Sequence, residues 1–289
     1  MITSLPSEIR SHCEKQLGPI KDFTPVSGGC INNGCCLKTH KGPVFVKWNS
    51  AKKFPQMFTE EKSGLALLGK ADCIRIPKVL SCYEGEQYSC LLLEWIASAP
   101  RDKNYWSALG QQLADLHRQT QNYFGLDHDN YIGSLHQYNS QTDKGVDFFI
   151  EQRLMPQVRL AQKTGRVDLN DVHKFDILYK ELPSLLTNEA ASLTHGDLWS
   201  GNLMTDDKGM PTLIDPAVSY THREVDLGYT ILFGGFDQEF YQIYNESFPL
   251  LSGYRERLEI YNLYPLLVHV NLFGGGYRQQ VMSIMNRYI

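Results

Sequence analysis

The sequence predicts an α+β fold of two lobes, in which a small antiparallel sheet with one helix precedes a mostly helical lobe. Three observations support this prediction. Short strand-like runs dominate up to residue 96, helical periodicity dominates after it, and the 289 residues are 42% hydrophobic, which suits a chain with a substantial core. We therefore expect an N-terminal lobe over 1–96 built on the sheet, and a mostly helical C-terminal lobe over 97–289.

Five short runs rich in apolar and β-branched residues predict the strands of the first lobe. The first two flank a glycine-rich segment, SGGCINNG, and the third follows the second through a turn at HKGP. The last two are separated by the polar segment YEGEQ, which predicts an antiparallel pair. These runs lie at 23–26, 35–39, 44–48, 76–82 and 89–96.

One helix is predicted inside this lobe, over 54–70. Its residues Met57, Glu61, Leu65 and Leu68 recur at spacings of four, four and three, so they share one face. Glu61 is the charged member of this face and is therefore expected to point inward.

Helical periodicity predicts most of the second lobe. In the first of its helices, Leu109, Leu113 and Leu116 recur at helical spacing. Because strands precede helices instead of alternating with them, we expect a sheet lobe followed by a helical lobe. The predicted helices lie at 105–120, 146–160, 171–186, 237–248 and 254–270.

Charge and composition argue against several classes of partner. The formal net charge of -4 is spread over interspersed acidic and basic residues, so no basic stripe predicts nucleic-acid binding. No apolar run approaches the roughly 20 residues that span a bilayer, and the N-terminus lacks the layout of a signal peptide. We therefore expect a cytoplasmic protein with no membrane partner. The seven cysteines form no C-x-x-C pair, which favours reduced thiols.

The most informative segment is LTHGDLWSGNLMTDDKGMPTLIDPA, residues 193–217. Asp197 and Asn202 are five residues apart, and Asp215 follows a short apolar run. Phosphoryl transfer needs a carboxylate that orients the acceptor hydroxyl and oxygen ligands that hold magnesium on the phosphates. We therefore interpret Asp197 as the catalytic residue, and Asn202 and Asp215 as metal ligands. The alternative is structural, with Asp197 capping a helix and Asn202 in a turn.

This spacing resembles the catalytic-loop and metal-binding motifs of protein kinases. Two departures narrow the class: Gly196 replaces the arginine of the His-Arg-Asp motif, and Asp215-Pro216 replaces Asp-Phe-Gly. About ten residues separate Asp215 from a helix start at EVDLG, which leaves no room for a long activation segment that binds a polypeptide. We expect the acceptor to be a small molecule, or a small adduct carried on something larger.

Four motifs together resemble the fructosamine kinase family, also called ketosamine-3-kinases: HGDLWSGN (195–202), IDPAVSYTHREVDLG (214–228), FGGF (233–236) and GGCINNG (28–34). The resemblance covers nearly the whole chain, including PVFVKW and FFIEQRLMPQ. It implies a protein-kinase-like fold, ATP and Mg²⁺ as cofactors, and a ketosamine acceptor such as fructoselysine or ribuloselysine, phosphorylated on the third hydroxyl of the sugar. Products of this family decompose and release the free amine, which implies a deglycating repair activity.

The nucleotide side of the site is predicted in the first lobe. Lys47 alternates with apolar residues on a strand near the glycine loop, and resembles the phosphate-binding lysine of kinases. Either Glu60 or Glu61 is its expected ion-pair partner, and the apolar face favours Glu61. Backbone groups predicted to bind ATP belong to Gly28, Gly29 and Cys30 in the loop and to Glu94 and Ile96 in LLLEWI, where Leu93 guards the back of the pocket.

Two alternatives stay open on this side. The thiol of Cys30 is either redox-active or inert, and LLLEWI is either the adenine-binding segment or a buried edge strand without a ligand.

On the acceptor side, Trp199 follows Asp197 by two residues and can present a ring face to a sugar or to a cationic amine. It can equally pack the catalytic loop. The family resemblance adds His269 and Asn271 as sugar hydrogen-bonding residues, with a buried core histidine as the alternative. Asp226 in REVDLG is interpreted as an anchor of the catalytic loop.

Two other functions compete with this interpretation. One is a different small-alcohol kinase of the same fold, acting on an aminoglycoside or on choline. The other is a pseudokinase that binds nucleotide as an interaction module. The presence of Lys47, Asp197, Asn202 and Asp215 argues against the pseudokinase, because such proteins usually lack at least one of these groups.

Overall fold

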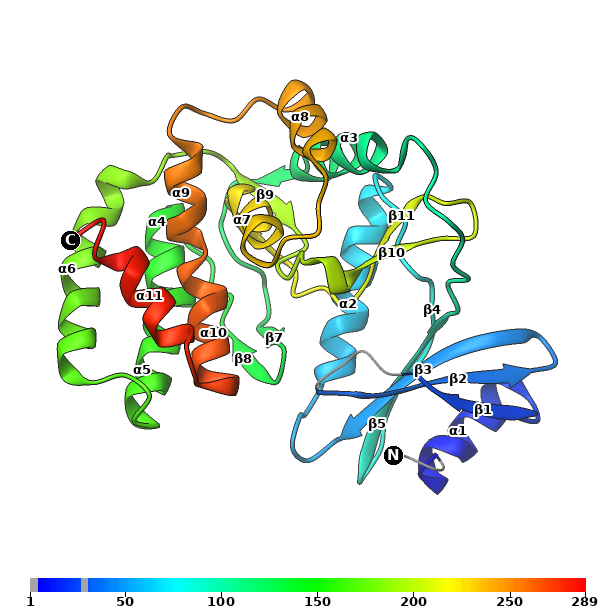
Figure 1. Ribbon diagram of the computed structural model, residues 1–289. Helices are drawn as coiled ribbons and strands as arrows, with labels where there is room; N and C mark the ends of the chain where they lie inside the picture. The colour runs from blue at the N-terminus through cyan, green and yellow to red at the C-terminus, as the bar shows by residue number, and fades with distance from the viewer. Residues whose placement is uncertain (1–4, 27–30) are drawn as a thin grey trace. The chain divides into compact units, whose positions relative to one another are not determined.

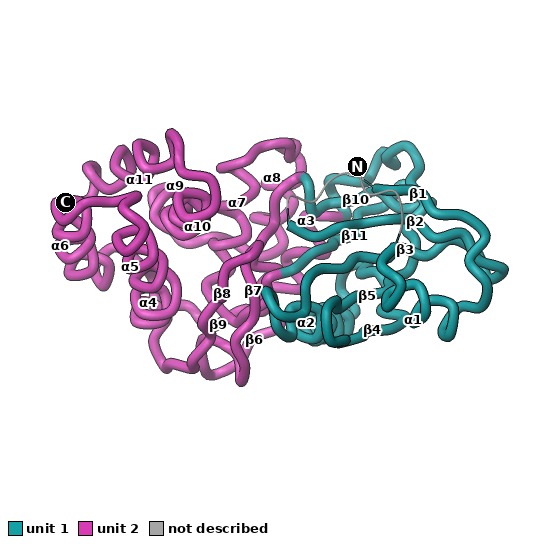
Figure 2. The backbone as a smooth tube through the Cα atoms, turned by 90° about the horizontal axis from the view of Figure 1, so that it is seen from below, with its two compact units in different colours: residues 1–108, 201–216 teal, residues 109–200, 217–289 magenta. Residues whose placement is uncertain are grey.

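The structure is a computed structural model that describes residues 5–26 and 31–289 (Figure 1). It divides into two compact units (Figure 2). The first unit comprises Met1–Ala108 with Gly201–Pro216, and the second comprises Leu109–Ser200 with Ala217–Ile289. These units differ from the expected lobes because residues 201–216 group with the N-terminal part of the chain; the boundary at residue 97 stays a prediction.

The first unit is built on a five-stranded antiparallel sheet, and all five predicted strands are present with ends shifted by a few residues. The strand order is β1-β2-β3-β5-β4, so the pair predicted around YEGEQ is confirmed as β4 and β5. The strands are β1 (Asp22–Pro25), β2 (Asn33–Thr39), β3 (Gly42–Ser50), β4 (Val79–Glu84) and β5 (Tyr88–Glu94).

Each face of this sheet packs against one helix, because successive strand side chains point to opposite faces. On one face Val44, Val46 and Leu92 pack with Ile9 and Cys13 of α1 (Ser7–Leu17). On the other face, Leu91 and Leu93 pack with Phe58 and Leu65 of α2 (Met57–Ala71).

The two helices differ in how well the sequence predicts them. Helix α2 confirms the predicted helix, and Met57, Leu65 and Leu68 of its apolar face are buried. Helix α1 was not predicted, because only Ile9 and Cys13 of its polar sequence are buried. Its Glu8 accepts hydrogen bonds from the backbone N–H groups of Glu86 and Tyr88, which attaches α1 to the β4–β5 turn.

A second, shorter antiparallel hairpin completes the first unit. Strands β10 (Leu203–Thr205) and β11 (Pro211–Leu213) pair over three residues each. A turn of 3₁₀ helix, Ser200–Asn202, leads into β10, and Ile214 and Asp215 follow β11. Asn202 therefore comes just before the first strand of the hairpin and Asp215 just after the second, so both lie at its open end, opposite the turn.

The second unit is mostly helical, as predicted. It also holds two small sheets, formed by β6 (Thr120–Gln121), β9 (Ala191–Thr194) and β12 (Ser219–Thr221), and by β7 (Asn130–Ile132) and β8 (Leu135–Gln137). Its α-helices are α3 (Tyr105–His117, beginning in the first unit), α4 (Gly145–Phe148), α5 (Met155–Lys163), α6 (Leu169–Leu185), α7 (Glu224–Phe233), α8 (Gln238–Ser247), α9 (Tyr254–Tyr261), α10 (Leu263–Phe273) and α11 (Tyr277–Met285).

Two predicted helices are interrupted, and prolines explain both interruptions. Between α4 and α5 the chain forms a π-helix, Phe149–Leu154, followed by Pro156, which has no N–H for the regular helical bond. The predicted helix 254–270 is two helices, α9 and α10, because the ring of Pro265 clashes with a continuous helix through residue 261. Helix α11 was not predicted.

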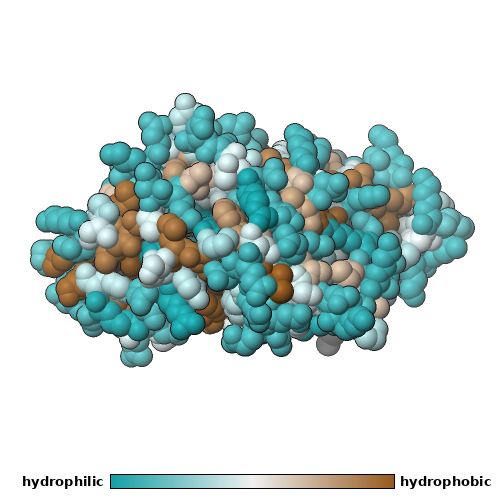
Figure 3. Space-filling model, turned by 90° about the horizontal axis from the view of Figure 1, so that it is seen from above, coloured by the Kyte–Doolittle hydropathy of each residue, from teal (hydrophilic) through white to brown (hydrophobic). Residues whose placement is uncertain are grey.

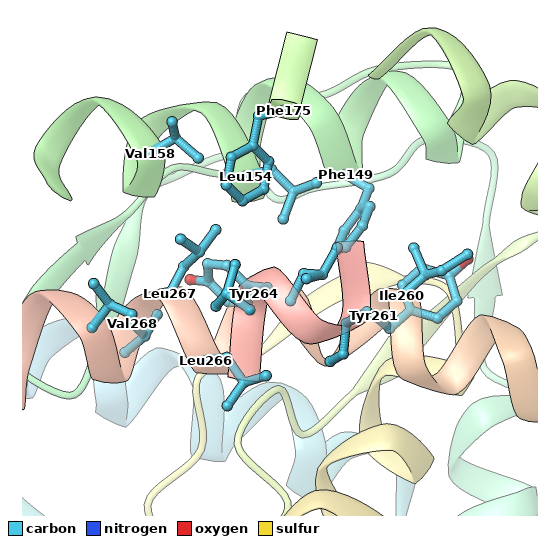
Figure 4. Close-up of a cluster of buried hydrophobic side chains, with 14 of the residues drawn as sticks. Phe149, Leu154, Val158, Phe175, Ile260, Tyr261, Tyr264, Leu266, Leu267 and Val268 are labelled. Atoms are coloured by element: carbon cyan, nitrogen blue, oxygen red, sulfur yellow. The ribbon is translucent and has the colours of Figure 1, made fainter. Parts of the chain in front are cut away.

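The core of the second unit lies among these helices (Figure 4). Phe149 and Leu154 of the π-helix, Phe175 of α6, and Tyr261 and Leu267 of α9 and α10 are all nearly inaccessible to solvent. Burial of apolar side chains is the main favourable contribution to the stability of such a unit.

On the face drawn in Figure 3, hydrophilic residues predominate, with smaller groups of hydrophobic residues between them. Within residues 5–26 and 31–289, no helix combines the length and the apolar character needed to cross a membrane.

Candidate functional site

Lys47 is the centre of a buried ion-pair network in the first unit. Its side chain on β3 is only 4% exposed, and its Nζ atom lies 2.6 Å from Oδ1 of Asp215. It also forms an ion pair with the carboxylate of Glu61 on α2, whose side chain is 10% exposed. The structure thus selects Glu61 as the ion-pair partner of Lys47 and adds Asp215, which the sequence did not link to this lysine.

The charges in this network depend on one another. Burial opposes the charge on Lys47, but the carboxylates of Asp215 and Glu61 outweigh burial and raise the lysine's pKa. Burial raises the pKa of Glu61 to about 7, and the attraction of Lys47 limits that rise. Lys47 therefore stays protonated, whereas Glu61 changes charge near neutral pH.

Asn202 and Asp215 are held together by the ends of the β10–β11 hairpin. The N–H group of Ile214 donates to the carbonyl oxygen of Asn202 at 3.0 Å, and Nδ2 of Asn202 lies 3.5 Å from the carbonyl oxygen of Asp215. Asp215 has a φ of 51°, in the left-handed region that residues other than glycine rarely adopt. Such backbone strain is often found at functional sites.

These two residues suit a magnesium ion. Carboxylate and amide oxygens are the ligands that hard cations prefer, and the contact of Asn202 with Asp215 uses Nδ2, not the oxygen that a cation needs. Among the described residues, no group of three or more His, Cys, Asp or Glu side chains is placed to hold a metal alone. Phosphate oxygens and water would have to complete the coordination, as is usual for magnesium bound with a nucleotide.

Asp197 lies in the second unit, in the loop after β9. The preceding Gly196 has a φ of 81°, and a Cβ atom at that position would lie 2.0 Å from the carbonyl oxygen of Ala217. No other residue fits without moving the backbone. This close contact explains why glycine stands where protein kinases have arginine.

Asp226 on α7 anchors this loop, which confirms its interpretation from the sequence. Its Oδ2 atom accepts a hydrogen bond from the N–H group of His195 at 2.7 Å, and its Oδ1 atom accepts one from the N–H group of Gly196 at 2.8 Å. Burial opposes the charge on Asp226, yet the hydrogen bond from His117 and the one from the N–H group of Gly196 lower its pKa. The buried carboxylate therefore stays ionised.

His117 is a further member of this anchor that the sequence did not reveal. Its Nε2 atom lies 3.1 Å from Oδ2 of Asp226, and its Nδ1 atom lies 2.8 Å from the hydroxyl group of Tyr244. Because a carboxylate can only accept, Nε2 donates to Asp226. A lone histidine at the end of a helix has no sequence signal that separates this role from ordinary packing.

The acceptor-side candidates Trp199 and His269 belong to one row of rings in the second unit. The side chain of Trp199 is 37% exposed and packs edge-on against Phe233, with ring centres 6.3 Å apart. Phe233 in turn lies 5.1 Å from the ring of His269. The Nδ1 atom of His269 bonds the carbonyl oxygen of Pro265, and burial lowers the pKa of His269, so the neutral ring predominates.

Asn271 stands apart from this row. Its Nδ2 atom donates to the carbonyl oxygen of Gln157 at 2.9 Å and to Oε1 of Gln157 at 2.8 Å. These bonds connect α10 to α5. The Oδ1 atom of Asn271 is buried, has no hydrogen-bond partner and is closed to solvent, so the sugar-binding role of Asn271 stays a prediction.

The remaining nucleotide candidates lie at two places. Glu94 ends β5, and its N–H group donates to the carbonyl oxygen of Lys78 at 2.8 Å, while Ile96 is buried two residues later. Gly28, Gly29 and Cys30 lie outside the described residues.

Comparisons with known proteins point to one family over the whole chain. The family model described as fructosamine kinase matches residues 1–289. A probable ketoamine kinase of Synechocystis sp. is 39% identical over 93% of this chain and 90% of its own. A chloroplastic protein-ribulosamine 3-kinase of Oryza sativa subsp. indica is 36% identical over 93% of this chain and 79% of its own.

Solved structures agree in fold. A protein of Thermobifida fusca, assigned as a fructosamine-3-kinase, matches with a TM-score of 0.87 and 30% identity, covering 96% of both chains. An aminoglycoside phosphotransferase, APH(4)-Ia, matches with a TM-score of 0.61 at 14% identity, over 96% of this chain and 98% of its own. This second likeness supports the protein-kinase-like fold alone.

Proposed function

Because the chain belongs to the fructosamine kinase family, we propose that it transfers the γ-phosphoryl group of ATP to the 3-hydroxyl group of a ketosamine such as fructoselysine or ribuloselysine. In this reaction the bond between the γ-phosphorus and the β,γ-bridging oxygen breaks, and a bond from that phosphorus to the sugar oxygen forms. The hydroxyl proton leaves and ADP is released. The observation that supports this function most directly is the buried network of Lys47, Glu61 and Asp215.

The first unit supplies the groups for the nucleotide. Lys47 stays charged and donates to α- and β-phosphate oxygens, while Glu61 orients its ammonium group. Asn202 and Asp215 would hold magnesium, which would neutralise negative charge on the phosphates. Backbone groups of Glu94 and Ile96 bind adenine, and those of Gly28, Gly29 and Cys30 approach the phosphates.

The second unit supplies the groups for the acceptor. Asp197 orients the attacking hydroxyl group and accepts its proton, and the hydrogen bonds of Asp226 fix the loop that carries Asp197. Trp199 presents its exposed ring to the sugar or to the secondary ammonium group of a ketosamine. Neutral His269 accepts hydrogen bonds from sugar hydroxyl groups, and Asn271 is the second sugar-binding residue that we propose.

The wider role that we propose is deglycation in the cytoplasm. Ketosamines form from a sugar and an amine, and release of the free amine after phosphorylation reverses this modification. The described relatives are named for ketoamine and ribulosamine substrates. We propose small ketosamines as the primary acceptors, and adducts carried on proteins as a second class.

The test is mass spectrometry of fructoselysine and ribuloselysine incubated with the enzyme and Mg-ATP. We expect the addition of one phosphoryl group, followed by recovery of free lysine. Fructose and an aminoglycoside, tested in parallel, should gain little phosphate. Efficient phosphorylation of the aminoglycoside and of neither ketosamine would overturn the proposed acceptor and leave a kinase of another small alcohol.

A further inference from the structure

Arg75, between α2 and β4 of the first unit, contacts three carboxylates from two separate segments. Its Nη2 atom lies 2.9 Å from Oε1 of Glu94, at the end of β5. Its Nη1 atom lies 2.6 Å from Oδ2 of Asp206 and 3.0 Å from Oδ1 of Asp207, in the turn of the β10–β11 hairpin. One guanidinium group therefore links the end of the large sheet to the turn of the small hairpin.

Asp206 is both the partner of Arg75 and the residue that shapes the turn. Its Oδ1 atom accepts hydrogen bonds from the N–H groups of Lys208 and Met210, each at 2.8 Å, while its Oδ2 atom faces Arg75. The side chain of Asp206 is 4% exposed. Without Arg75, this carboxylate, which is itself nearly inaccessible, would lose its cationic partner, and an unpaired buried charge is costly.

The backbone of Arg75 also pairs with the hairpin. The N–H group of Leu213 donates to the carbonyl oxygen of Arg75 at 3.0 Å, and Arg75 forms a parallel bridge with Thr212. Arg75 thus contacts the hairpin at its turn through the side chain and along β11 through the backbone. Only the side-chain contacts are lost when Arg75 is substituted.

The segment after β5 rests on the same turn. The N–H group of Ala99 donates to the carbonyl oxygen of Asp206 at 3.1 Å, and that of Asp102 donates to the carbonyl oxygen of Gly209 at 3.0 Å. Gly209 has a φ of 78°, and a Cβ atom there would lie 2.7 Å from the backbone of Asp102 and of Pro100. The chain leaving Glu94 is therefore packed tightly against the hairpin turn.

We propose that Arg75 is a positioning residue for the metal-binding ends of the hairpin, and that it couples the proposed adenine segment at Glu94 to Asn202 and Asp215. This inference rests on the proposed function of those residues. The hairpin pairs over three residues per strand, and so short a hairpin is marginally stable alone. The register of the hairpin, and with it the placement of Asn202 and Asp215, therefore depends on contacts with residues outside the hairpin.

An arginine suits this role and a lysine does not. The planar guanidinium group presents several donors in fixed directions, so it can bind Glu94 and the two aspartates at once. A lysine offers a single charged atom, which can approach one side of the junction at a time. Arg75→Lys should therefore keep the charge and lose part of the coupling.

The test uses the full chain with a non-hydrolysable ATP analogue and no acceptor. Calorimetric titration with magnesium should show that Arg75→Ala weakens binding of the magnesium complex about tenfold, whereas binding of the metal-free analogue changes less than about twofold. Amide hydrogen exchange should rise across 203–213 in this variant. Arg75→Lys should fall between Arg75→Ala and the parent.

The matched control is Arg10→Ala, which removes an exposed arginine of the same unit from its ion pair with Glu14. It should behave as the parent in both measurements. If Arg75→Ala fails to fold, Asp207→Asn removes one exposed partner of Arg75 and should give a smaller shift in the same direction.

The proposal would be overturned if Arg75→Ala weakened binding of the ATP analogue equally with and without magnesium. It would also be overturned if this variant had lower thermal stability but unchanged nucleotide binding and unchanged amide exchange. If the parent binds no magnesium–nucleotide complex, the proposed function fails instead. In that case hairpin exchange unchanged by Arg75→Ala would overturn the positioning role, and increased exchange would support it.

Discussion

Asp226 Oδ1 accepts a hydrogen bond from the backbone N–H group of Gly196 at 2.8 Å, immediately before the proposed catalytic residue Asp197. The other oxygen of Asp226 binds the N–H group of His195, so both carboxylate oxygens face backbone donors. An asparagine would turn an amide donor toward one of them. The position of Asp197 therefore depends on a residue that need not touch the substrate.

We expect Asp226→Asn to lower kcat by roughly 10²-fold, because small displacements of a catalytic group have effects of this size. The KM for ATP should change little. Steady-state kinetics on fructoselysine measures both. The control is Asp237→Asn at the N-terminus of α8, where either side chain can cap the helix. Loss of ATP affinity equal to the loss of kcat would contradict the anchoring role.

Asp197→Ala should lower the rate of phosphoryl transfer by about 10²–10⁴ and leave nucleotide binding largely intact. The reason is that Asp197 acts on the acceptor hydroxyl group, while the nucleotide groups belong to other residues. Single-turnover kinetics and calorimetric titration with the ATP analogue give the two quantities. Turnover within a few-fold of the parent would show that Asp197 is structural.

Asp215→Ala should abolish magnesium-dependent turnover at any attainable metal concentration. Asp215 is proposed as an oxygen ligand of magnesium and is also a charge partner of Lys47, so one substitution removes both interactions. The activity is measured across a magnesium titration. Asp22→Ala, which removes an exposed carboxylate paired with Lys38 on the same sheet, should titrate as the parent does. A parental magnesium dependence in Asp215→Ala would sink the assignment.

His222 should make the protein less stable in acid. Burial lowers its pKa from 6.5 to about 4. Between these values the unfolded chain binds a proton at this residue and the folded chain does not, so the free energy of unfolding falls as pH decreases from 6.5 to 4. The shift corresponds to a loss on the order of 3 kcal/mol.

Urea unfolding at several pH values between 7 and 4 tests this contribution. The stability of His222→Gln should depend less on pH than that of the parent, whereas substitution of the exposed His40 by Gln should leave the dependence unchanged. The variants must be compared with the parent because Glu61 also contributes to the pH dependence. The pKa of Glu61 is raised to about 7, so its contribution to the free energy of unfolding increases as the pH falls from about 7 to about 4.5. Parallel curves for His222→Gln and the parent would contradict the prediction.

Local patterns account for the parts of the fold that were predicted. The alternation around Lys47 and the apolar face of Met57, Leu65 and Leu68 identified a strand and a helix, since each pattern reflects which side chains the element buries. The same face placed Glu61 inward and so selected it as the lysine's partner. Helix α1 could not be predicted, because only two of its eleven residues are buried and two apolar positions do not establish a helical period in the sequence.

The sequence by itself determined the α+β class, the five strands of the sheet, the Lys47–Glu61 pair and the segment that holds Asp197, Asn202 and Asp215. Spacing along a strand, a helix or a short motif is a property of neighbouring residues, so it can be read from the chain. Tertiary structure alone decided the contact of Asp226 with His117, 109 residues away, and the contacts of Arg75 with Asp206 and Glu94. These depend on which distant segments fold against each other, and hydrogen bonds between them leave no period in the sequence.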